Sequence, residues 1–125
     1  MKMISFKLLD SSFWLNYFHN GFGRELIDGD ENLYTSVLSL FEIKRKLLKQ
    51  NEKASVINKV LRFIKLRSFI VQLSEKIVEE AAKISDEKSL HAIDSLIYTS
   101  SIFNNLTLLT FDNDFRGLKN VEVLD

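Results

Sequence analysis

The sequence predicts an α/β fold of three layers, in which a central, mostly parallel sheet is flanked by helices. One observation is that short apolar segments of strand character alternate with segments whose apolar residues recur at helical spacing, as in strand–helix–strand units. The other is size, because 125 residues, 46% of them hydrophobic, suit one domain with one core. We therefore expect a single domain over residues 1–125.

The first half of the chain alternates strand and helix twice. An apolar run ends at an acid, an aromatic-rich segment follows, and glycine, asparagine and aspartate then supply turns. Ser39 and Glu42 have the spacing of a capping box, so the second helix is expected to open at Ser39 and to end near residue 50. The other elements expected in this half are a strand at 3–9, a helix at 11–20, a loop at 20–32 and a strand at 33–37.

The second half continues the alternation. Helical spacing of apolar residues is clearest in the segment 54–67. Ser89 stands where it would cap the last helix. The elements expected here are helices at 54–67, 75–85 and 90–104, and strands at 69–73, 106–110 and 121–124.

Composition excludes several classes of function. The 17 basic residues balance 17 acidic ones, so no overall field attracts nucleic acid or an anionic membrane. The absence of cysteine excludes disulfides, thiolate zinc sites and cysteine nucleophiles, and it suits a reducing compartment. Lys7 and Asp10 interrupt the N-terminal apolar run before it reaches signal-peptide length, and no run approaches the roughly 20 residues of a membrane span. We expect a soluble, cytoplasmic protein.

Acidic residues follow the predicted strands. Parallel sheets place their sites beyond the carboxyl ends of the strands, and the acids in those positions are Asp10, Glu42, Asp112 and Asp114. Singly, each has a structural explanation, as a helix cap, a capping-box residue or a member of an Asx turn. Asp94 differs, because helical spacing places it on the inward stripe of its helix, where a carboxylate needs a partner.

Together these acids predict a divalent-metal site. Independent caps have no reason to fall at one end of one sheet, whereas clustered carboxylates supply the hard oxygen ligands that Mg²⁺ or Mn²⁺ requires. Without a cation the like charges would repel one another and raise the pKa of each carboxyl group. We therefore expect Mg²⁺ or Mn²⁺ among these acids.

Four segments resemble the PIN domain family, and in particular the compact VapC-like toxins of prokaryotic toxin–antitoxin pairs. The segment FKLLDSS at 6–12 resembles the family's opening strand and Asp-Thr/Ser-Ser/Asn signature, and TSVLSLFEI at 35–43 resembles its second motif. HAIDSLI at 91–97 and LLTFDNDF at 108–115 resemble its closing block in residue types and spacing. The segment YTSS at 98–101 departs from the usual alanine-rich helix. The resemblance implies a PIN-like fold over nearly the whole chain.

The resemblance also implies a metal-dependent endoribonuclease, the toxin of a type II toxin–antitoxin pair. By position, the family's acidic quartet falls on Asp10, Glu42, Asp94 and Asp112. Asp114 is either a rival for the fourth metal-ligand place or an outer-shell group, and Ser12 and Thr110 match the hydroxyl positions beside the site. The resemblance further suggests a homodimer and a small antitoxin that lies in a hydrophobic groove and blocks the acidic site.

Two surfaces point to partners. Between residues 44 and 67 nine basic residues accompany one acid, Glu52, which fits either a surface for RNA phosphates or two solvated helix faces. The RNA-binding candidates are Lys44, Arg45, Lys46 and Lys49. The helix at 11–20 carries more apolar residues than one buried face needs, so another chain is expected to cover it.

Other functions stay open at this level. His19 and His91 would allow metal-free acid–base cleavage of RNA, although His91 shares a helix with Asp94 and His19 lies near a helix end. The scattered glycines form no phosphate-binding loop. A PIN-like RNA-binding or protein-interaction module with little turnover, or a housekeeping RNA-processing nuclease, would show the same sequence features.

Overall fold

The protein is built on a five-stranded sheet. The computed structural model describes residues 6–125. The strands lie in the order β3-β2-β1-β4-β5, and each of the four neighbouring pairs is parallel. Their bounds are β1 Phe6–Leu9, β2 Leu33–Ser36, β3 Ser68–Val71, β4 Leu106–Thr110 and β5 Val121–Val123. The predicted fold class is confirmed, while residues 3–5 of the first predicted strand lie outside the described residues.

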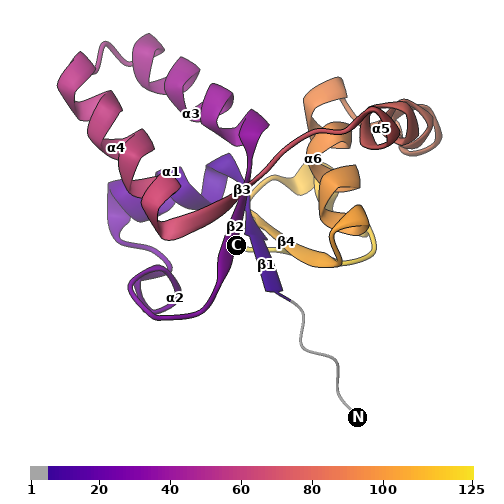
Figure 1. The fold of residues 1–125 in the computed structure, drawn as a ribbon, viewed down its shortest axis with the longest axis horizontal. Helices are drawn as coiled ribbons and strands as arrows, with labels where there is room; N and C mark the ends of the chain where they lie inside the picture. The colour runs from indigo at the N-terminus through magenta and orange to yellow at the C-terminus, as the bar shows by residue number, and fades with distance from the viewer. Residues whose placement is uncertain (1–5) are drawn as a thin grey trace.

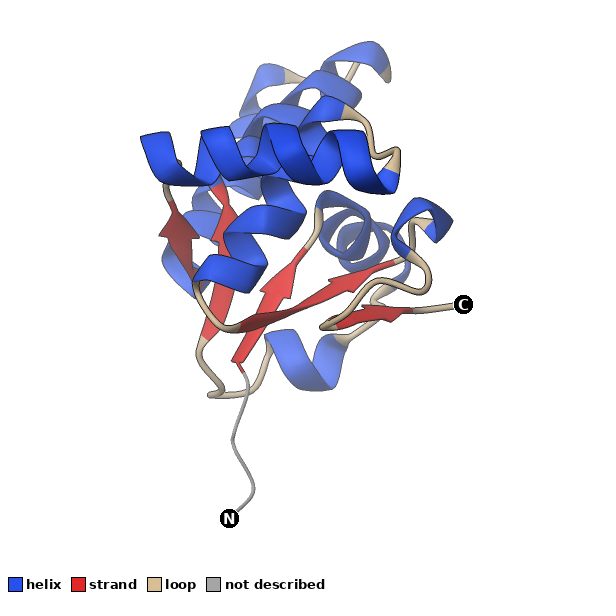
Figure 2. Cartoon of the chain, turned by 90° about the vertical axis from the view of Figure 1, so that its right-hand side faces the viewer, coloured by secondary structure: helices blue, strands red, loops and turns tan. Residues whose placement is uncertain are grey.

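Helices cover both faces of the sheet, with α1 to α4 on one side and α5 and α6 on the other (Figure 1, Figure 2). Leu9 packs in the core beneath α1, α3 and α4, and its neighbour Leu8 packs in the core beneath α6, because successive strand side chains point to opposite faces. No helix in the described part of the chain has the length and apolar character to cross a bilayer. The helical bounds are α1 Ser11–Asn20, α2 Arg24–Ile27, α3 Val37–Lys49, α4 Ala54–Arg67, α5 Glu75–Lys88, α6 Ala92–Phe103 and the 3₁₀ turn η1 Asn113–Phe115.

The N-cap of helix α3 lies three residues before the predicted one. Its N-cap is Ser36, the last residue of β2, whose Oγ accepts a hydrogen bond from the Leu38 N–H at 3.1 Å. Ser39 lies inside the first turn, fully buried, and its hydroxyl has no hydrogen-bond partner among residues 6–125. The capping-box assignment of Ser39 and Glu42 is therefore wrong, because β2 runs into α3 without a loop. Glu42 is thus free of a capping role.

Ser89 ends α5 and does not open α6. Its backbone is left-handed, with φ 56° and ψ 40°, and its N–H donates to the carbonyl oxygen of Ser85. Helix α6 begins at Ala92 after His91, whose side chain makes no capping hydrogen bond. The predicted cap is wrong because a serine between two helices suits either end in sequence, and the left-handed backbone at this position closes the first helix.

The apolar surface of α1 is covered mostly by the chain itself. Phe13 and Trp14 are fully buried. Phe13 packs against Phe22 of the following loop, and Trp14 packs against Phe63 of α4, at ring-centroid distances of 5.6 and 6.3 Å. Phe18 retains 37% exposure. The loop after α1 and helix α4 therefore supply part of the cover that the sequence assigns to another chain.

Candidate metal centre

Five carboxylates gather at the carboxyl edge of the sheet, beyond the neighbouring strands β1 and β4. They are Asp10 after β1, Glu42 in the second turn of α3, Asp94 in the first turn of α6, and Asp112 and Asp114 at η1 after β4. Carboxylate oxygens of Asp94, Asp112 and Asp114 lie within 4.8 Å of one another. The charges of Asp10, Asp94 and Asp112 act on Glu42 as well. The structure thus brings together all five acids that the sequence singles out.

Asp10 is the most deeply buried of the five, at 5% exposure. Its Oδ1 accepts from the Ser11 N–H at 2.8 Å, which makes it the N-cap of α1 as predicted. Its Oδ2 accepts from the hydroxyl of Thr110 at 2.7 Å and from that of Ser12 at 3.3 Å. Burial raises the pKa of Asp10, and these three hydrogen bonds oppose the rise because they favour the carboxylate. Asp10 is therefore held rigidly in one orientation.

Glu42 and Asp94 lie where a negative charge is disfavoured. Burial, and then the charge of Asp10, raise the pKa of Glu42 from 4.5 to about 7, although Ser11 Oγ donates to Glu42 Oε1 at 3.2 Å. Burial, and then the charges of Asp112 and Asp10, raise the pKa of Asp94 from 3.8 to about 6. Because carboxylate repulsion contributes to both shifts, a cation among these groups would reverse that contribution.

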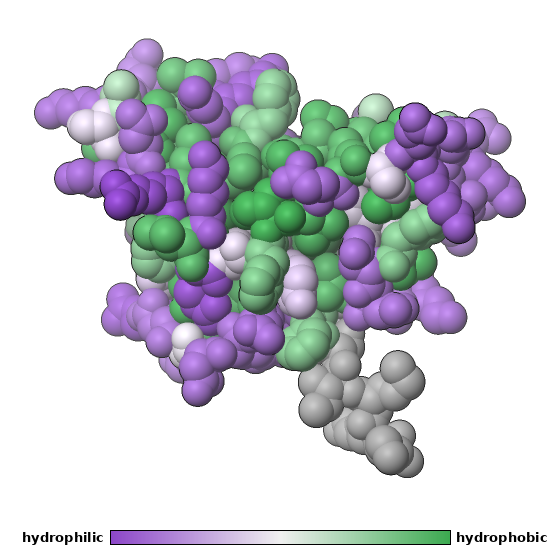
Figure 3. Space-filling model, viewed as in Figure 1, coloured by the Kyte–Doolittle hydropathy of each residue, from purple (hydrophilic) through white to green (hydrophobic). Residues whose placement is uncertain are grey.

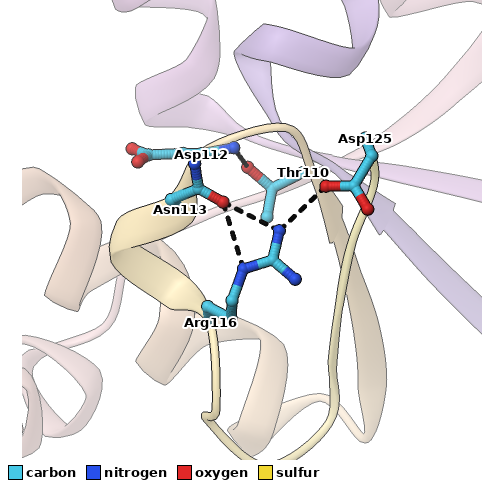
Figure 4. A network of polar contacts seen from close by, with 5 residues as sticks. All are labelled: Thr110, Asp112, Asn113, Arg116 and Asp125. Carbon is cyan, nitrogen blue, oxygen red and sulfur yellow. Dashed lines mark hydrogen bonds and ion pairs between the residues drawn. The ribbon is translucent and has the colours of Figure 1, made fainter.

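Within residues 6–125, no lysine or arginine forms an ion pair with this cluster. Neither of the two ion pairs found among residues 6–125 includes one of the five acids. Arg116 lies two residues after Asp114, and its guanidinium donates to Asn113 Oδ1 at 2.8 and 3.1 Å and to Asp125 Oδ1 at 3.0 Å. The carboxylate of Asp112 points away from that guanidinium (Figure 4). No ion pair within residues 6–125 therefore balances the negative charge of the cluster.

The donor set fits a hard divalent cation. Every donor is a carboxylate oxygen, which is the chemistry that Mg²⁺ and Mn²⁺ prefer. Asp112 is half-buried and its charge acts on Asp10, Glu42 and Asp94, whereas Asp114 is exposed and its charge acts on Asp94 alone. Asp112 thus occupies the more central position of the two. Its turn is fixed, since Asp112 Oδ1 accepts from the Asp114 N–H at 2.9 Å.

Comparison with known proteins places this fold and site in a family. The sequence model of the PIN domain matches residues 7–121. The chain belongs to the PIN domain family. The family resemblance of the four sequence segments is thereby confirmed. No curated protein matches the sequence significantly.

Solved structures share this PIN fold over nearly their whole length. A toxin–antitoxin complex from Klebsiella pneumoniae has a TM-score of 0.75 and 19% identity, covering 94% of this chain and 96% of the other. VapBC2 from Rickettsia felis, bound to a promoter DNA fragment, has a TM-score of 0.71 and 21% identity, and the match covers 96% of this chain and 99% of the other. VapC20 from Mycobacterium tuberculosis, described as a sarcin–ricin loop cleaving toxin, has a TM-score of 0.72 and 19% identity. The match covers 95% of this chain and 99% of the other. At these identities the likeness is one of fold.

Hydroxyl groups hold the acids of this PIN domain in place, and one of these hydroxyl groups was not predicted from the sequence. Ser12 Oγ lies 3.3 Å from Thr110 Oγ1 and accepts from the Phe111 N–H at 3.0 Å, so both predicted hydroxyls border the site. Ser11, which donates to Glu42, was missed. Its only sequence signal is its place beside Asp10, because the glutamate it contacts is 31 residues away.

The four predicted RNA-binding residues lie on the solvent side of α3. All four, Lys44, Arg45, Lys46 and Lys49, are exposed. Three of them, Arg45, Lys46 and Lys49, line a pocket of about 420 Å³ that the site residues Ser11, Ser12 and Glu42 also line. Lys44 lines an adjoining hollow of about 400 Å³. The basic surface of α3 therefore borders the acidic centre directly.

A Thr110→Val variant should be destabilised by roughly 1–3 kcal/mol, because the Asp10 carboxylate and the Asp112 N–H both lose their contact with the Thr110 hydroxyl. Thr99→Val is the matched control. Both threonines are fully buried, but Thr99 Oγ1 has no hydrogen-bond partner among residues 6–125, so valine should be neutral or stabilising there. Urea denaturation measures both changes, and equal values would contradict a role for Thr110 in holding the site.

Proposed function

We propose that this PIN domain is a divalent-metal-dependent endoribonuclease that hydrolyses RNA phosphodiester bonds with Mg²⁺ or Mn²⁺. One observation carries the proposal: five carboxylates share one sheet edge, and no lysine or arginine within residues 6–125 forms an ion pair with them. Such a cluster is costly unless a cation compensates it. The family membership and the relative described as a sarcin–ricin loop cleaving toxin support the same reading.

The roles in this proposal follow from the contacts. A bound cation would lower the pKa of a water molecule and stabilise charge on the phosphoryl oxygens. The acids that would hold it, directly or through water, are Asp10, Glu42, Asp94 and Asp112, with Asp114 at the rim. The hydroxyls of Thr110 and Ser12 keep the Asp10 carboxylate in place. Glu42 and Asp94 give up their protons as the site takes up the ion.

RNA would reach this site along α3. The basic residues Lys44, Arg45, Lys46 and Lys49 offer cationic groups to phosphates beside the acids, which would otherwise repel the substrate. The charge of the chain is strongly divided, since residues 44–67 hold nine basic residues and one acid in a protein of formal net charge zero. We therefore place the RNA-binding surface on the α3–α4 side of the site.

Cleavage of labelled single-stranded RNA tests the proposal. With Mg²⁺ or Mn²⁺ the protein should cut the RNA internally, and with EDTA it should not. A parallel thermal melt with and without the metal reports binding independently, since a ligand of the native state must raise the melting temperature. If the folded protein neither cuts RNA nor gains stability from either metal, the nuclease proposal fails and a protein-interaction role takes its place.

We propose further that the chain is the toxin of a toxin–antitoxin pair, acts in the cytoplasm as a homodimer, and is inhibited by a small antitoxin. Two solved relatives are described as a toxin–antitoxin complex and as VapBC2. Apolar side chains gather in the middle of one face of the molecule, over β2 and β3 (Figure 3). Phe6, Tyr34 and Phe69 form an aromatic row at centroid distances of 6.1 and 5.3 Å, and Phe69 is 57% exposed.

An exposed aromatic row of this kind suits a contact with another protein chain. Light scattering of the purified chain measures its oligomeric state, and a monomeric mass would overturn the homodimer. Co-expression of the chain with its genomic neighbour tests the antitoxin. Failure of that neighbour to suppress RNA cleavage would overturn its assignment.

A further inference from the structure

We propose that Phe41, Arg45 and Lys49 of α3 form a nucleotide-binding subsite for an unpaired nucleotide of the RNA, next to the phosphate that occupies the acidic centre. The base would lie against the Phe41 ring, and the phosphates that follow would contact Arg45 and Lys49. This inference rests on the proposed nuclease function. It adds that the RNA must be single-stranded at this position.

The three residues form one stripe that starts at the metal centre. They are spaced four apart on α3, so their side chains lie on the same face of the helix. The stripe is about 12 Å long, because eight residues separate its ends and each adds about 1.5 Å. Its first member, Phe41, directly precedes Glu42, so the stripe leads from the acids outward along the basic surface.

The stripe borders a hollow large enough for a nucleotide. The pocket of about 420 Å³ is lined by Phe41, Arg45 and Lys49 together with Leu15 and Ile93 on the apolar side and the site residues described above. This volume lies within the range of roughly 300–1,000 Å³ seen for small-molecule sites. The adjoining hollow of about 400 Å³ shares the three stripe residues. The same side chains are therefore accessible from both hollows.

Phe41 is presented to solvent in a way that packing does not explain. It is 57% exposed, as is Phe69, but Phe69 packs against the ring of Tyr34, whereas no aromatic ring within residues 6–125 packs against Phe41. An aromatic ring bordered by cations on its own helix is the combination that binds single-stranded nucleic acid, where the ring stacks on a base and the cations bind the backbone. A paired base is stacked within its duplex and offers no free face to a side chain.

Charge favours an anionic occupant for this pocket. Arg45, Lys46 and Lys49 line the pocket on the α3 side, while Glu42 lines it at the metal centre. A phosphodiester chain would place one phosphate at a cation held by the acids and its neighbours on the arginine and lysines. An apolar protein segment would leave those three charged groups without partners, so we assign the pocket to RNA.

A fluorescein-labelled ten-residue RNA of mixed sequence, half of it guanosine and cytidine, is the probe, used alone and annealed to its complement. Binding is measured with Mg²⁺ in an Asp94→Asn background, and cleavage is measured with Mn²⁺ in the otherwise wild-type chain. Phe41→Ala should weaken binding of the single strand by roughly 5-fold or more. Phe103→Ala is the matched control, because Phe103 is also exposed, at 40%, but lies at the carboxyl end of α6, and it should change binding less than about 2-fold. Phe41→Trp keeps a stacking surface and should restore binding.

The contribution of Arg45 and Lys49 is measured separately, from the dependence of RNA binding on salt concentration. Replacing Arg45 and Lys49 together with glutamine should lower the slope of log binding constant against log salt by about 1.4, since each phosphate contact on a single strand contributes about 0.7. The matched control replaces Lys83 and Lys88 of α5, which removes the same charge from exposed positions on the other side of the sheet. It should leave the slope unchanged.

The outcomes separate this inference from the function on which it rests. If the wild-type chain cuts RNA and Phe41→Ala behaves like Phe103→Ala, the subsite is wrong and the nuclease stands. If duplex RNA binds as tightly as the single strand, the requirement for an unpaired nucleotide is wrong. If Phe41→Ala spares RNA and weakens binding of the antitoxin, the pocket belongs to a protein. If wild type neither cuts nor binds RNA, the proposed function itself fails.

Discussion

An Asp94→Asn variant should lose metal-dependent RNA cleavage by roughly 100- to 1,000-fold while keeping its fold, because a metal-held transition state is worth several kcal/mol. Asp94 is the acid whose oxygen lies within 4.8 Å of those of both Asp112 and Asp114, and its charge also acts on Glu42. Asparagine keeps the shape and removes the charge that a cation requires. Cleavage rates at saturating Mg²⁺ and Mn²⁺ measure the loss.

The stability of the same variant distinguishes a metal ligand from a structural acid. Burial and neighbouring carboxylates raise the pKa of Asp94 to about 6, so its ionised form destabilises the metal-free fold. At pH 8 without metal, Asp94→Asn should therefore melt no lower than wild type. Asp86→Asn on the exposed side of α5 controls for the change in net charge. Wild-type cleavage rates in Asp94→Asn would show that the nuclease activity does not come from this site.

The fold was predictable because its strongest signals are local and repeat along the chain. Each strand is short and contains apolar residues, and β1 to β4 each connect forward to a helix or turn in the expected order. Parallel neighbours in a sheet require such crossovers. Once the alternation is recognised, the carboxyl ends of the strands must share one edge, which is why Asp10 and Asp112 could be expected together from sequence.

Helix boundaries were less predictable because different caps use the same residue types. Ser36 and Ser39 both precede helical residues, and the one that caps is decided by where β2 stops pairing with its neighbours. Ser89 lies between two helices, and its left-handed backbone, which sequence does not report for a serine, makes it a C-cap. These choices depend on tertiary context and not on the local pattern.

The acidic residues of the candidate site could be predicted from the sequence, but the contacts that hold them in place could not. Four acids followed from position and the family motifs, while the contact of Ser11 with Glu42 joins residues 31 apart. The burial of α1 likewise depends on Phe63, contributed by a helix more than forty residues further along the chain. The more central position of Asp112 relative to Asp114 could be seen only in the structure. The two residues differ in burial and in which neighbouring carboxyl groups their charges affect.

The metal-free protein should lose stability as pH rises from about 4 to 7, and a divalent cation should reverse that loss. The pKa of Glu42 is raised from 4.5 to about 7 and that of Asp94 from 3.8 to about 6. Over this window the folded chain therefore holds protons that the unfolded chain has already released. Raising the pH removes those protons and, with them, the stability they contribute.

Metal binding has the opposite pH dependence, because the cation needs the ionised carboxylates. At pH 8, Mg²⁺ or Mn²⁺ at about 100 times its dissociation constant should add about 2.7 kcal/mol, a rise in melting temperature of roughly 10 °C, and the rise should shrink towards pH 5. Thermal melts across pH with metal or with EDTA measure both trends. Glu42→Gln tests the contribution of this residue, because it should reduce the dependence of stability on pH in the metal-free protein between about pH 5 and 7.5. A pH dependence equal to that of wild type would contradict the raised pKa of Glu42.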